Sequence, residues 1–176
     1  MTKESMRIFL GVVFFGIIGA LLYFVPLSFA KGGQAPEIIS PTWINSKPLR
    51  MEELRGKVVM VEFWTFGCWN CRKIEPYVKG WHQKYADKGL VVIAVHSPEF
   101  SHEKDVENVK AYVKKNGISY AVPIDNDFLN WRRYQNRYWP TLYVIDKNGT
   151  IQYTRIGEGA YEQTEEAIQR LLLEPA

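Results

Sequence analysis

The chain has 176 residues, of which 47% are hydrophobic and 23% charged, and its formal net charge at pH 7 is +3. This composition is typical of a globular protein and excludes disorder as the default state. The length predicts one domain with a substantial core plus a terminal segment. The lysines and arginines are spread along the chain, so the charge indicates no nucleic-acid partner. The densest basic stretch, residues 131–137, is interpreted as a solvated helix face.

The N-terminal region contains an uncharged apolar run at residues 8–30. It is longer than the roughly 7–15 residues of a signal-peptide core and matches the roughly 20 residues of a spanning helix. We therefore expect the first 30 residues to form an uncleaved membrane anchor, although Ser28 and Ala30 also fit a cleavage site and leave a signal segment open. Lys3 and Arg7 precede the run, which predicts an N-terminus inside the cytoplasmic membrane and the rest of the chain outside it.

After this run the chain alternates between strand and helix patterns. Residues 31–50 are rich in glycine and proline and predict a linker and N-terminal extension before a main domain at 51–176. Residues 58–66 form a nearly continuous β-branched and aromatic run, typical of a central strand buried on both faces. A helix is expected over 69–86, and a second buried strand over 90–96.

The second half continues the alternation. Three more helices are expected, at residues 103–117, 127–135 and 161–174. Asn148 and Gly149 lie between two β-rich runs and are the strongest hairpin signal in the chain. Together the elements predict an α/β fold with a central mixed β-sheet and helices on both faces, preceded by the N-terminal transmembrane helix.

Both cysteines of the chain, Cys68 and Cys71, lie where the strand at 58–66 gives way to the helix at 69–86. A structural disulfide across so short a loop would stabilise the fold by only about 2 kcal/mol, and a structural zinc site needs four ligands that the scattered histidines do not supply. A reaction centre fits better. Free N–H groups and the positive end of the helix favour a Cys68 thiolate, whereas Cys71, one turn deeper, should be less exposed.

Glu62 is the only carboxylate in the apolar strand that precedes the cysteines. Burial would raise its pKa, so it could accept the proton of Cys71 during exchange; a strand-end glutamate paired with a lysine is the alternative. Arg72 and Lys73 follow the pair and either lower the pKa of Cys68 or are solvated helix residues.

Two segments carry a resemblance to a known family. "VEFWTFGCWNC", with a proline five residues after the second cysteine, resembles the active-site segment of the thioredoxin superfamily, and "RYWPTLYVIDKNGTI" resembles its cis-proline strand and hairpin. With the apolar N-terminus and the helix-bearing insert, the chain is similar to the membrane-anchored TlpA/ResA-like branch, above all to the thioredoxin-like domain of DipZ-type proteins. The resemblance covers residues 36–175.

The resemblance implies a thioredoxin-like fold and a set of site residues. Cys68 matches the nucleophile, Cys71 the resolving cysteine, Glu62 the buried acid and Pro140 the cis-proline beside the disulfide. In this superfamily the two residues between the cysteines and the residue before the cis-proline influence redox poise and substrate choice. These positions hold Trp69, Asn70 and Trp139.

The function that follows is that of a thiol–disulfide oxidoreductase acting on protein disulfides outside the cytoplasmic membrane, on the periplasmic side, with reduction favoured over oxidation. The resemblance implies a membrane electron-donor partner and a role in cytochrome c maturation or thiol redox homeostasis; no cofactor, metal or nucleic acid is expected. The alternative is a membrane-tethered metal-binding module or metallochaperone, because the two thiolates of Cys68 and Cys71 could hold copper(I).

Overall fold

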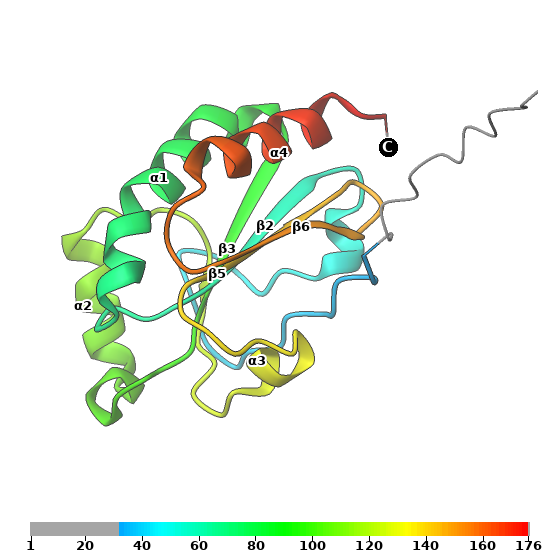
Figure 1. The fold of residues 1–176 in the computed structure, drawn as a ribbon. Helices are drawn as coiled ribbons and strands as arrows, with labels where there is room; N and C mark the ends of the chain where they lie inside the picture. Colours follow the sequence, from blue (N-terminus) through cyan, green and yellow to red (C-terminus); the bar gives the residue numbers. More distant parts are fainter. Residues whose placement is uncertain (1–31, 176) are drawn as a thin grey trace, which may run out of the picture.

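The computed structural model describes residues 32–175 (Figure 1). The expected anchor at residues 8–30 lies outside the described residues. Within residues 32–175, no helix combines the length and the apolar character that crossing a membrane requires.

The centre of the molecule is a four-stranded sheet in the order β3-β2-β5-β6. Its strands are β2 (Val58–Trp64), β3 (Leu90–His96), β5 (Thr141–Ile145) and β6 (Ile151–Ile156). β2 runs parallel to β3 and antiparallel to β5, and β5 and β6 form the hairpin expected at the Asn-Gly turn. The mixed sheet is therefore confirmed. A small second sheet pairs β1 (Trp43–Ile44) with β4 (Val122–Pro123).

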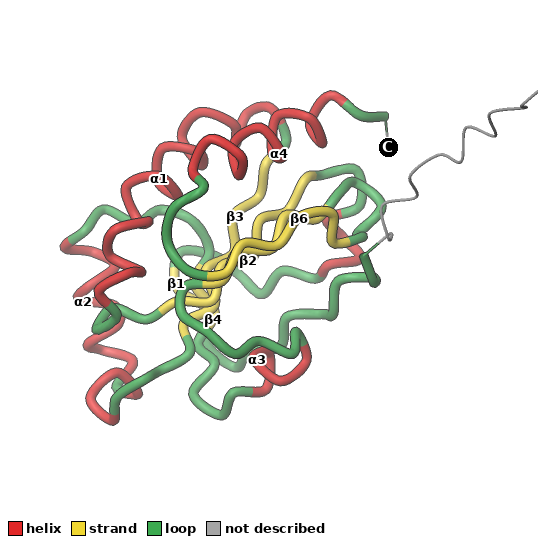
Figure 2. Tube along the Cα trace, in the orientation of Figure 1, coloured by secondary structure: helices red, strands yellow, loops and turns green. Residues whose placement is uncertain are grey.

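Helices flank the sheet on both faces (Figures 1 and 2). They are α1 (Trp69–Tyr85), α2 (Val106–Lys115), α3 (Leu129–Arg133) and α4 (Tyr161–Leu173), with short 3₁₀ turns at Met51–Leu54, Ala86–Lys88 and Ser101–Lys104. α1 and α4 lie against one face, and α3 lies below the other. The helix expected at 103–117 begins later, because the side chain of Asp105 accepts a hydrogen bond from Glu107 N (2.9 Å) and caps α2 there.

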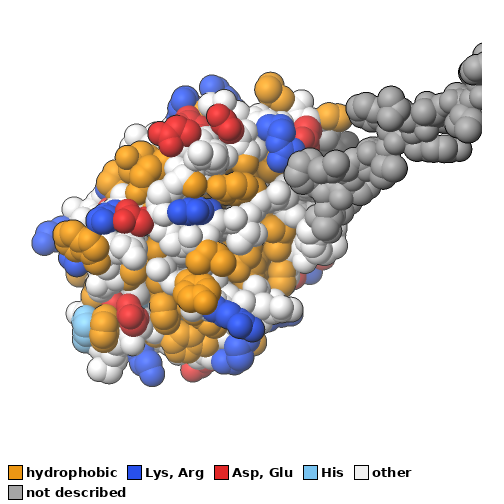
Figure 3. All heavy atoms as spheres, in the orientation of Figure 1, with side chains coloured by type: hydrophobic (Ala, Val, Ile, Leu, Met, Phe, Trp, Pro, Cys, Tyr) orange, Lys and Arg blue, Asp and Glu red, His pale blue; other side chains and the backbone are white. Residues whose placement is uncertain are grey.

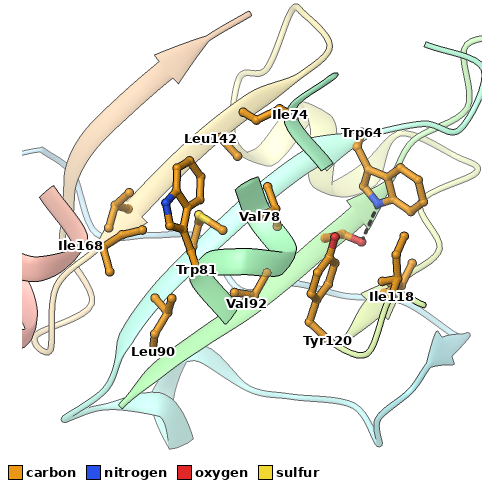
Figure 4. Packing of buried hydrophobic residues seen from close by; sticks show 14 of the residues in the cluster. Trp64, Ile74, Val78, Trp81, Leu90, Val92, Ile118, Tyr120, Leu142 and Ile168 are labelled. Carbon is orange, nitrogen blue, oxygen red and sulfur yellow. Dashed lines mark hydrogen bonds between the residues drawn. The ribbon is translucent and has the colours of Figure 1, made fainter. Parts of the chain in front are cut away.

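The side chains of β2 are buried on both faces of the sheet. On one face Met60 and Trp64 pack with α1, α2 and α4 in a single cluster, part of which Figure 4 shows, and Trp64 Nε1 donates to the carbonyl of Ala94 (3.1 Å). On the other face Phe63 makes an edge contact with Tyr134, with ring centroids 5.3 Å apart. Burial on both faces explains why the strand sequence is apolar throughout.

The described part of the 31–50 segment lies against the second face of the sheet. Ile38 is buried there, and the Tyr134 hydroxyl donates to the carbonyl of Pro36 (2.9 Å). The carboxylate of Glu37 accepts from Met51 N (2.8 Å). On the face of the molecule shown in Figure 3, basic and acidic side chains are interspersed and apolar side chains lie in several separate groups.

Candidate active site

The two cysteines meet at the carboxyl end of β2, where the chain enters α1. Cys68 is the N-cap of α1, and its Sγ accepts a hydrogen bond from Cys71 N (3.3 Å). Both residues are free thiols; Cys68 is partly exposed, whereas Cys71 is only 2% exposed. The strand-to-helix junction therefore presents one accessible sulfur and holds a second, buried sulfur beside it.

The surroundings push the pKa values of the two thiols apart. A hydrogen bond from the Cys71 side chain, together with backbone N–H bonds from Cys71 and Asn70, outweighs partial burial and lowers the pKa of Cys68 to about 7. Burial, followed by the bond to Cys68, raises the pKa of Cys71 far above its ordinary value. Near neutral pH a large part of Cys68 is thiolate while Cys71 stays protonated, as an attacking and a resolving thiol require.

The two basic residues after the pair have other partners. Lys73 Nζ lies 2.8 Å from Glu158 Oε1, and the Arg72 guanidinium stacks 5.3 Å from the ring centre of Trp69. Both side chains are exposed. The solvated alternative of the sequence analysis is therefore the one that the structure supports.

Glu62 lies on the α1 side of β2. It is two residues from both Met60 and Trp64, whose side chains pack on that side, and side chains two residues apart in a strand point to the same face. It is 3% exposed, and no ion pair among residues 32–175 includes it, so the lysine-paired alternative is wrong. Burial first, then the charges of Glu75 and Cys68, raise the pKa of Glu62 to about 8. Its carboxyl is thus a buried acid that titrates close to neutral pH.

The Trp139–Pro140 peptide bond is cis. β5 starts at Thr141, which pairs with Phe63 of β2, so this register brings residues 139 and 140 beside the loop that carries Cys68. Trp139 is half-buried and packs on the same cluster as Cys68. Its indole is held in place on two sides, since its Nε1 donates to the Ser97 carbonyl (2.9 Å) and its ring centre lies 4.2 Å from that of Trp131.

The two residues between the cysteines point outward. Trp69 is 65% exposed and Asn70 is also exposed. Trp69 and Asn70 follow Cys68 in the chain and half-buried Trp139 packs on the same cluster as Cys68, so we call these three residues the rim around Cys68. Glu62, by contrast, is buried but near enough for the charge of Cys68 to act on its pKa. The residues singled out from the sequence therefore gather at one end of β2, in an outer and an inner layer.

A family model described as the AhpC/TSA family matches residues 31–154. The chain belongs to the AhpC/TSA family. The protein DipZ of Mycobacterium tuberculosis is 44% identical to it over 144 residues, which are 80% of this chain and 21% of DipZ. The thiol-disulfide oxidoreductase ResA of Bacillus cereus is 31% identical over 140 residues, or 80% of this chain and 78% of ResA. The chain thus spans about a fifth of the length of the DipZ proteins that it matches.

Solved structures with the same fold agree with the AhpC/TSA assignment. A thioredoxin-like protein whose oxidised form was determined in solution superposes with a TM-score of 0.74 at 28% identity, covering 82% of this chain and 98% of that one. A thiol-disulfide isomerase from Corynebacterium glutamicum gives a TM-score of 0.69 at 26% identity, covering 80% and 97%. The thioredoxin-like fold expected from the resemblance is confirmed.

Two site residues of this AhpC/TSA member, Glu75 and Glu103, were not found from the sequence. Glu75 is buried on α1, where its carboxylate accepts from the Tyr112 hydroxyl (2.8 Å) and pairs with Lys79 (3.1 Å); its position four residues after Cys71 is a helical spacing that could have identified it. Glu103 contacts the loop before Cys68 from a distant segment, and no local pattern marks it. Residues 32–175 contain no group of three or more metal-ligating side chains.

Proposed function

We propose that this chain is a thiol–disulfide oxidoreductase that reduces protein disulfides on the extracytoplasmic side of the cytoplasmic membrane. The observation that carries the proposal is the asymmetry of the pair: Cys68 is accessible with a pKa of about 7, and Cys71 is buried with a raised pKa beside it. An accessible thiolate with a protonated partner one turn away is the arrangement that disulfide exchange needs.

The reaction begins when the Cys68 thiolate attacks one sulfur of a substrate disulfide. A mixed disulfide forms, the substrate S–S bond breaks, and the second substrate sulfur leaves as a thiolate that takes a proton from solvent. Cys71 then loses its proton and attacks Cys68 Sγ, whose neighbour it already is at the helix N-terminus. This step releases the first substrate sulfur as a thiolate. Two electrons pass to the substrate, and Cys68 and Cys71 are left as a disulfide.

Glu62 is proposed to receive the proton of Cys71. In the reduced protein the charge of Cys68 raises the pKa of both Glu62 and Cys71. When Cys68 enters the mixed disulfide it no longer carries that charge, so both pKa values fall at the moment when Cys71 must ionise. At pH 7 the Glu62 carboxyl is protonated while its pKa is about 8; it ionises as that pKa falls, and the resulting carboxylate can take the proton of Cys71.

Reduction is proposed over oxidation because of the pKa of Cys68. A strongly oxidising pair has a nucleophile with a pKa of about 3.5, since a stable thiolate stabilises the reduced form, whereas thioredoxin has a value of about 7. The pKa of Cys68, about 7, is close to the thioredoxin value. A spent pair must be reduced again, so the proposal includes a membrane electron-donor protein.

The location rests on the N-terminal sequence. The uncharged run at 8–30 with Lys3 and Arg7 before it supports a single-pass anchor and an external domain. Service to cytochrome c maturation or to general thiol homeostasis is proposed from the resemblance to the TlpA/ResA-like branch. The similarity to a relative named thiol-disulfide oxidoreductase ResA supports the chemistry of the proposal.

Trapping of the mixed disulfide tests the function. In the full-length chain with Cys71→Ser, attack by Cys68 can occur but resolution cannot, so we expect substrate proteins joined to Cys68 that dithiothreitol releases. Cys68→Ser is the matched control and should trap nothing. Exchange activity retained by Cys68→Ser, with no adduct on Cys71→Ser, would contradict the roles. Stoichiometric copper or zinc on the purified protein, with no turnover on disulfides, would favour the metal-binding alternative.

A further inference from the structure

Glu103 has a buried carboxylate that is surrounded by hydrogen-bond donors. The residue is 0% exposed, and its Oε1 accepts from Gly67 N (2.7 Å). Its Oε2 accepts from Glu99 N (2.6 Å) and Phe100 N (2.8 Å). A carboxylate accepts such bonds with both oxygens, whereas a protonated carboxyl would present its own O–H to one of these N–H groups. The contacts therefore favour the ionised form.

The pKa of Glu103 agrees with this geometry. Burial raises it, but hydrogen bonds from Phe100, the Thr65 hydroxyl, Glu99 and Gly67 together outweigh burial and hold the pKa below its ordinary value. Four donors from two separate segments thus converge on one side chain. Two of them, Thr65 and Gly67, lie on the loop that joins β2 to Cys68.

A second buried side chain supports the same loop. His96 Nε2 lies 3.2 Å from Thr65 Oγ1, and burial lowers the pKa of His96 to about 4, so its ring is neutral. The Thr65 side chain thus contacts the end of β3 through His96. The loop is therefore held at two points, by His96 at the end of β3 and by Glu103 in the 3₁₀ turn before α2.

Gly67 fits this contact because it has no side chain. A Cβ on Gly67 would overlap Glu103 Oε1 and lie 3.3 Å from Phe100 Cδ2. Gly67 is not among the glycines with positive φ, so the approach of the carboxylate and not the backbone conformation excludes a larger residue. Gly67 directly precedes Cys68, and this contact determines how the chain enters the helix cap.

We propose that Glu103 is a positioning residue for the nucleophile: its carboxylate holds Gly67 N–H and thereby keeps Cys68 Sγ in front of the backbone donors of the first helical turn. The inference rests on the proposed disulfide exchange, because the position of Cys68 Sγ matters for function only if Cys68 is the nucleophile of that reaction. Without the bond to Glu103, the residue before Cys68 is free to rotate. Cys68 Sγ then spends less time at the amides of Cys71 and Asn70, which lower its pKa.

Positioning and simple electrostatics predict opposite results when the charge of Glu103 is removed. A negative charge near a thiol disfavours the thiolate, so its removal alone would lower the pKa of Cys68. Loss of positioning would raise that pKa, because the amide hydrogen bonds to Sγ weaken. A role confined to the 99–103 turn would leave it unchanged. The sign of the change therefore distinguishes the three explanations.

The test compares the full-length protein with Glu103→Gln. The pH dependence of iodoacetamide alkylation at Cys68, located by mass spectrometry, reports the thiolate directly and needs no disulfide substrate. We expect a wild-type midpoint of about 7 and an upward shift of about half a pH unit or more in the variant, which is roughly a threefold slower alkylation at pH 6. A glutamine offers one acceptor oxygen and turns an N–H₂ group toward the remaining donors.

Asp146→Asn is the matched control. Asp146 is a buried carboxylate that accepts from Asn148 N (2.9 Å), Thr150 N (2.8 Å) and Gln152 Nε2 (2.7 Å), but it follows β5 at the end of the sheet away from the cysteines. This variant should lose stability and keep the alkylation midpoint of Cys68. An equal shift in Asp146→Asn would show that the midpoint follows general destabilisation, and would overturn the inference.

Gly67→Ala provides a second route if Glu103→Gln does not fold, because it separates the same two groups from the other side. It should also raise the midpoint. A midpoint that is unchanged or lower in either folded variant overturns the inference. A wild-type protein with a midpoint of about 7 that reduces no protein disulfide would instead refute the proposed function, and the comparison of midpoints would still decide the role of Glu103.

Discussion

Replacing Glu62 with glutamine should make the protein more stable and less active. The buried carboxyl of Glu62 has its pKa raised from 4.5 to about 8, chiefly by burial. An acid whose pKa is raised on folding contributes stability that is fully present below its unfolded pKa and is lost as the pH rises through the folded pKa. Glutamine resembles the protonated form and carries no such penalty, so the gain should appear only above pH 4.5.

The magnitude follows from the two pKa values. At pH 7 the folded state keeps a carboxyl protonated about 2.5 pH units above its ordinary pKa, and at about 1.4 kcal/mol per unit this costs about 3 kcal/mol. The same relation makes the advantage of Glu62→Gln over wild type grow by about 3 kcal/mol between pH 5 and pH 8. This is a large part of the stability of an ordinary domain.

Urea unfolding at pH 5, 6, 7 and 8, read by tryptophan fluorescence on both proteins in the reduced state, measures this difference. Glu165→Gln is the matched control: that carboxylate is bonded to Lys84 and Tyr85, which lower its pKa, so its removal should produce a small loss of stability at the higher pH values. Disulfide exchange measured in parallel should be slower in Glu62→Gln near neutral pH, because Cys71 loses its proton acceptor.

A stability difference that is flat from pH 5 to pH 8 would refute the reasoning, because it would mean that the Glu62 carboxyl ionises as easily in the folded protein as in water. A stability difference that grows with pH as predicted, together with an unchanged pH–rate profile of disulfide exchange, would separate the claim about burial from the claim about proton transfer. In that case Glu62 would be a buried acid, as the structure has it, but not the acceptor of the Cys71 proton.

Two further predictions concern the rim around Cys68. Because Trp69 is 65% exposed, Trp69→Ala should leave the free energy of unfolding within about 0.5 kcal/mol of wild type. The variant should slow the reduction of a protein disulfide more than that of a small disulfide, and equal slowing of both would contradict a role in substrate contact. Trp139→Phe keeps the packing on Trp131 but removes the donor to the Ser97 carbonyl, so it should cost about 1 kcal/mol of unfolding free energy. Trp139→Ala should cost about 3 kcal/mol or more. No loss in Trp139→Phe would contradict the role of the hydrogen bond, and equal losses in both variants would contradict the role of the packing.

Local patterns predicted most of the elements. The strand of the Cys68 segment, expected at 58–66, is β2 at Val58–Trp64, and the helix expected at 69–86 is α1 at Trp69–Tyr85. These predictions succeed because periodicity and capping depend on neighbours in the chain. The helix expected at 127–135 shrinks to Leu129–Arg133, since Phe128 before it and Gln135 after it adopt left-handed conformations.

The sequence by itself determined that two cysteines stand at a strand-to-helix junction, with an acid in the preceding strand. The tertiary structure alone decided what these groups face: that Glu62 is buried near Cys68 without an ion pair among residues 32–175, and that Glu103 reaches Gly67 across 36 positions of the chain. The reason is physical. Periodicity reports which side chains are buried, but a pKa or a hydrogen bond depends on which distant segment packs against them, and only the closed fold specifies that.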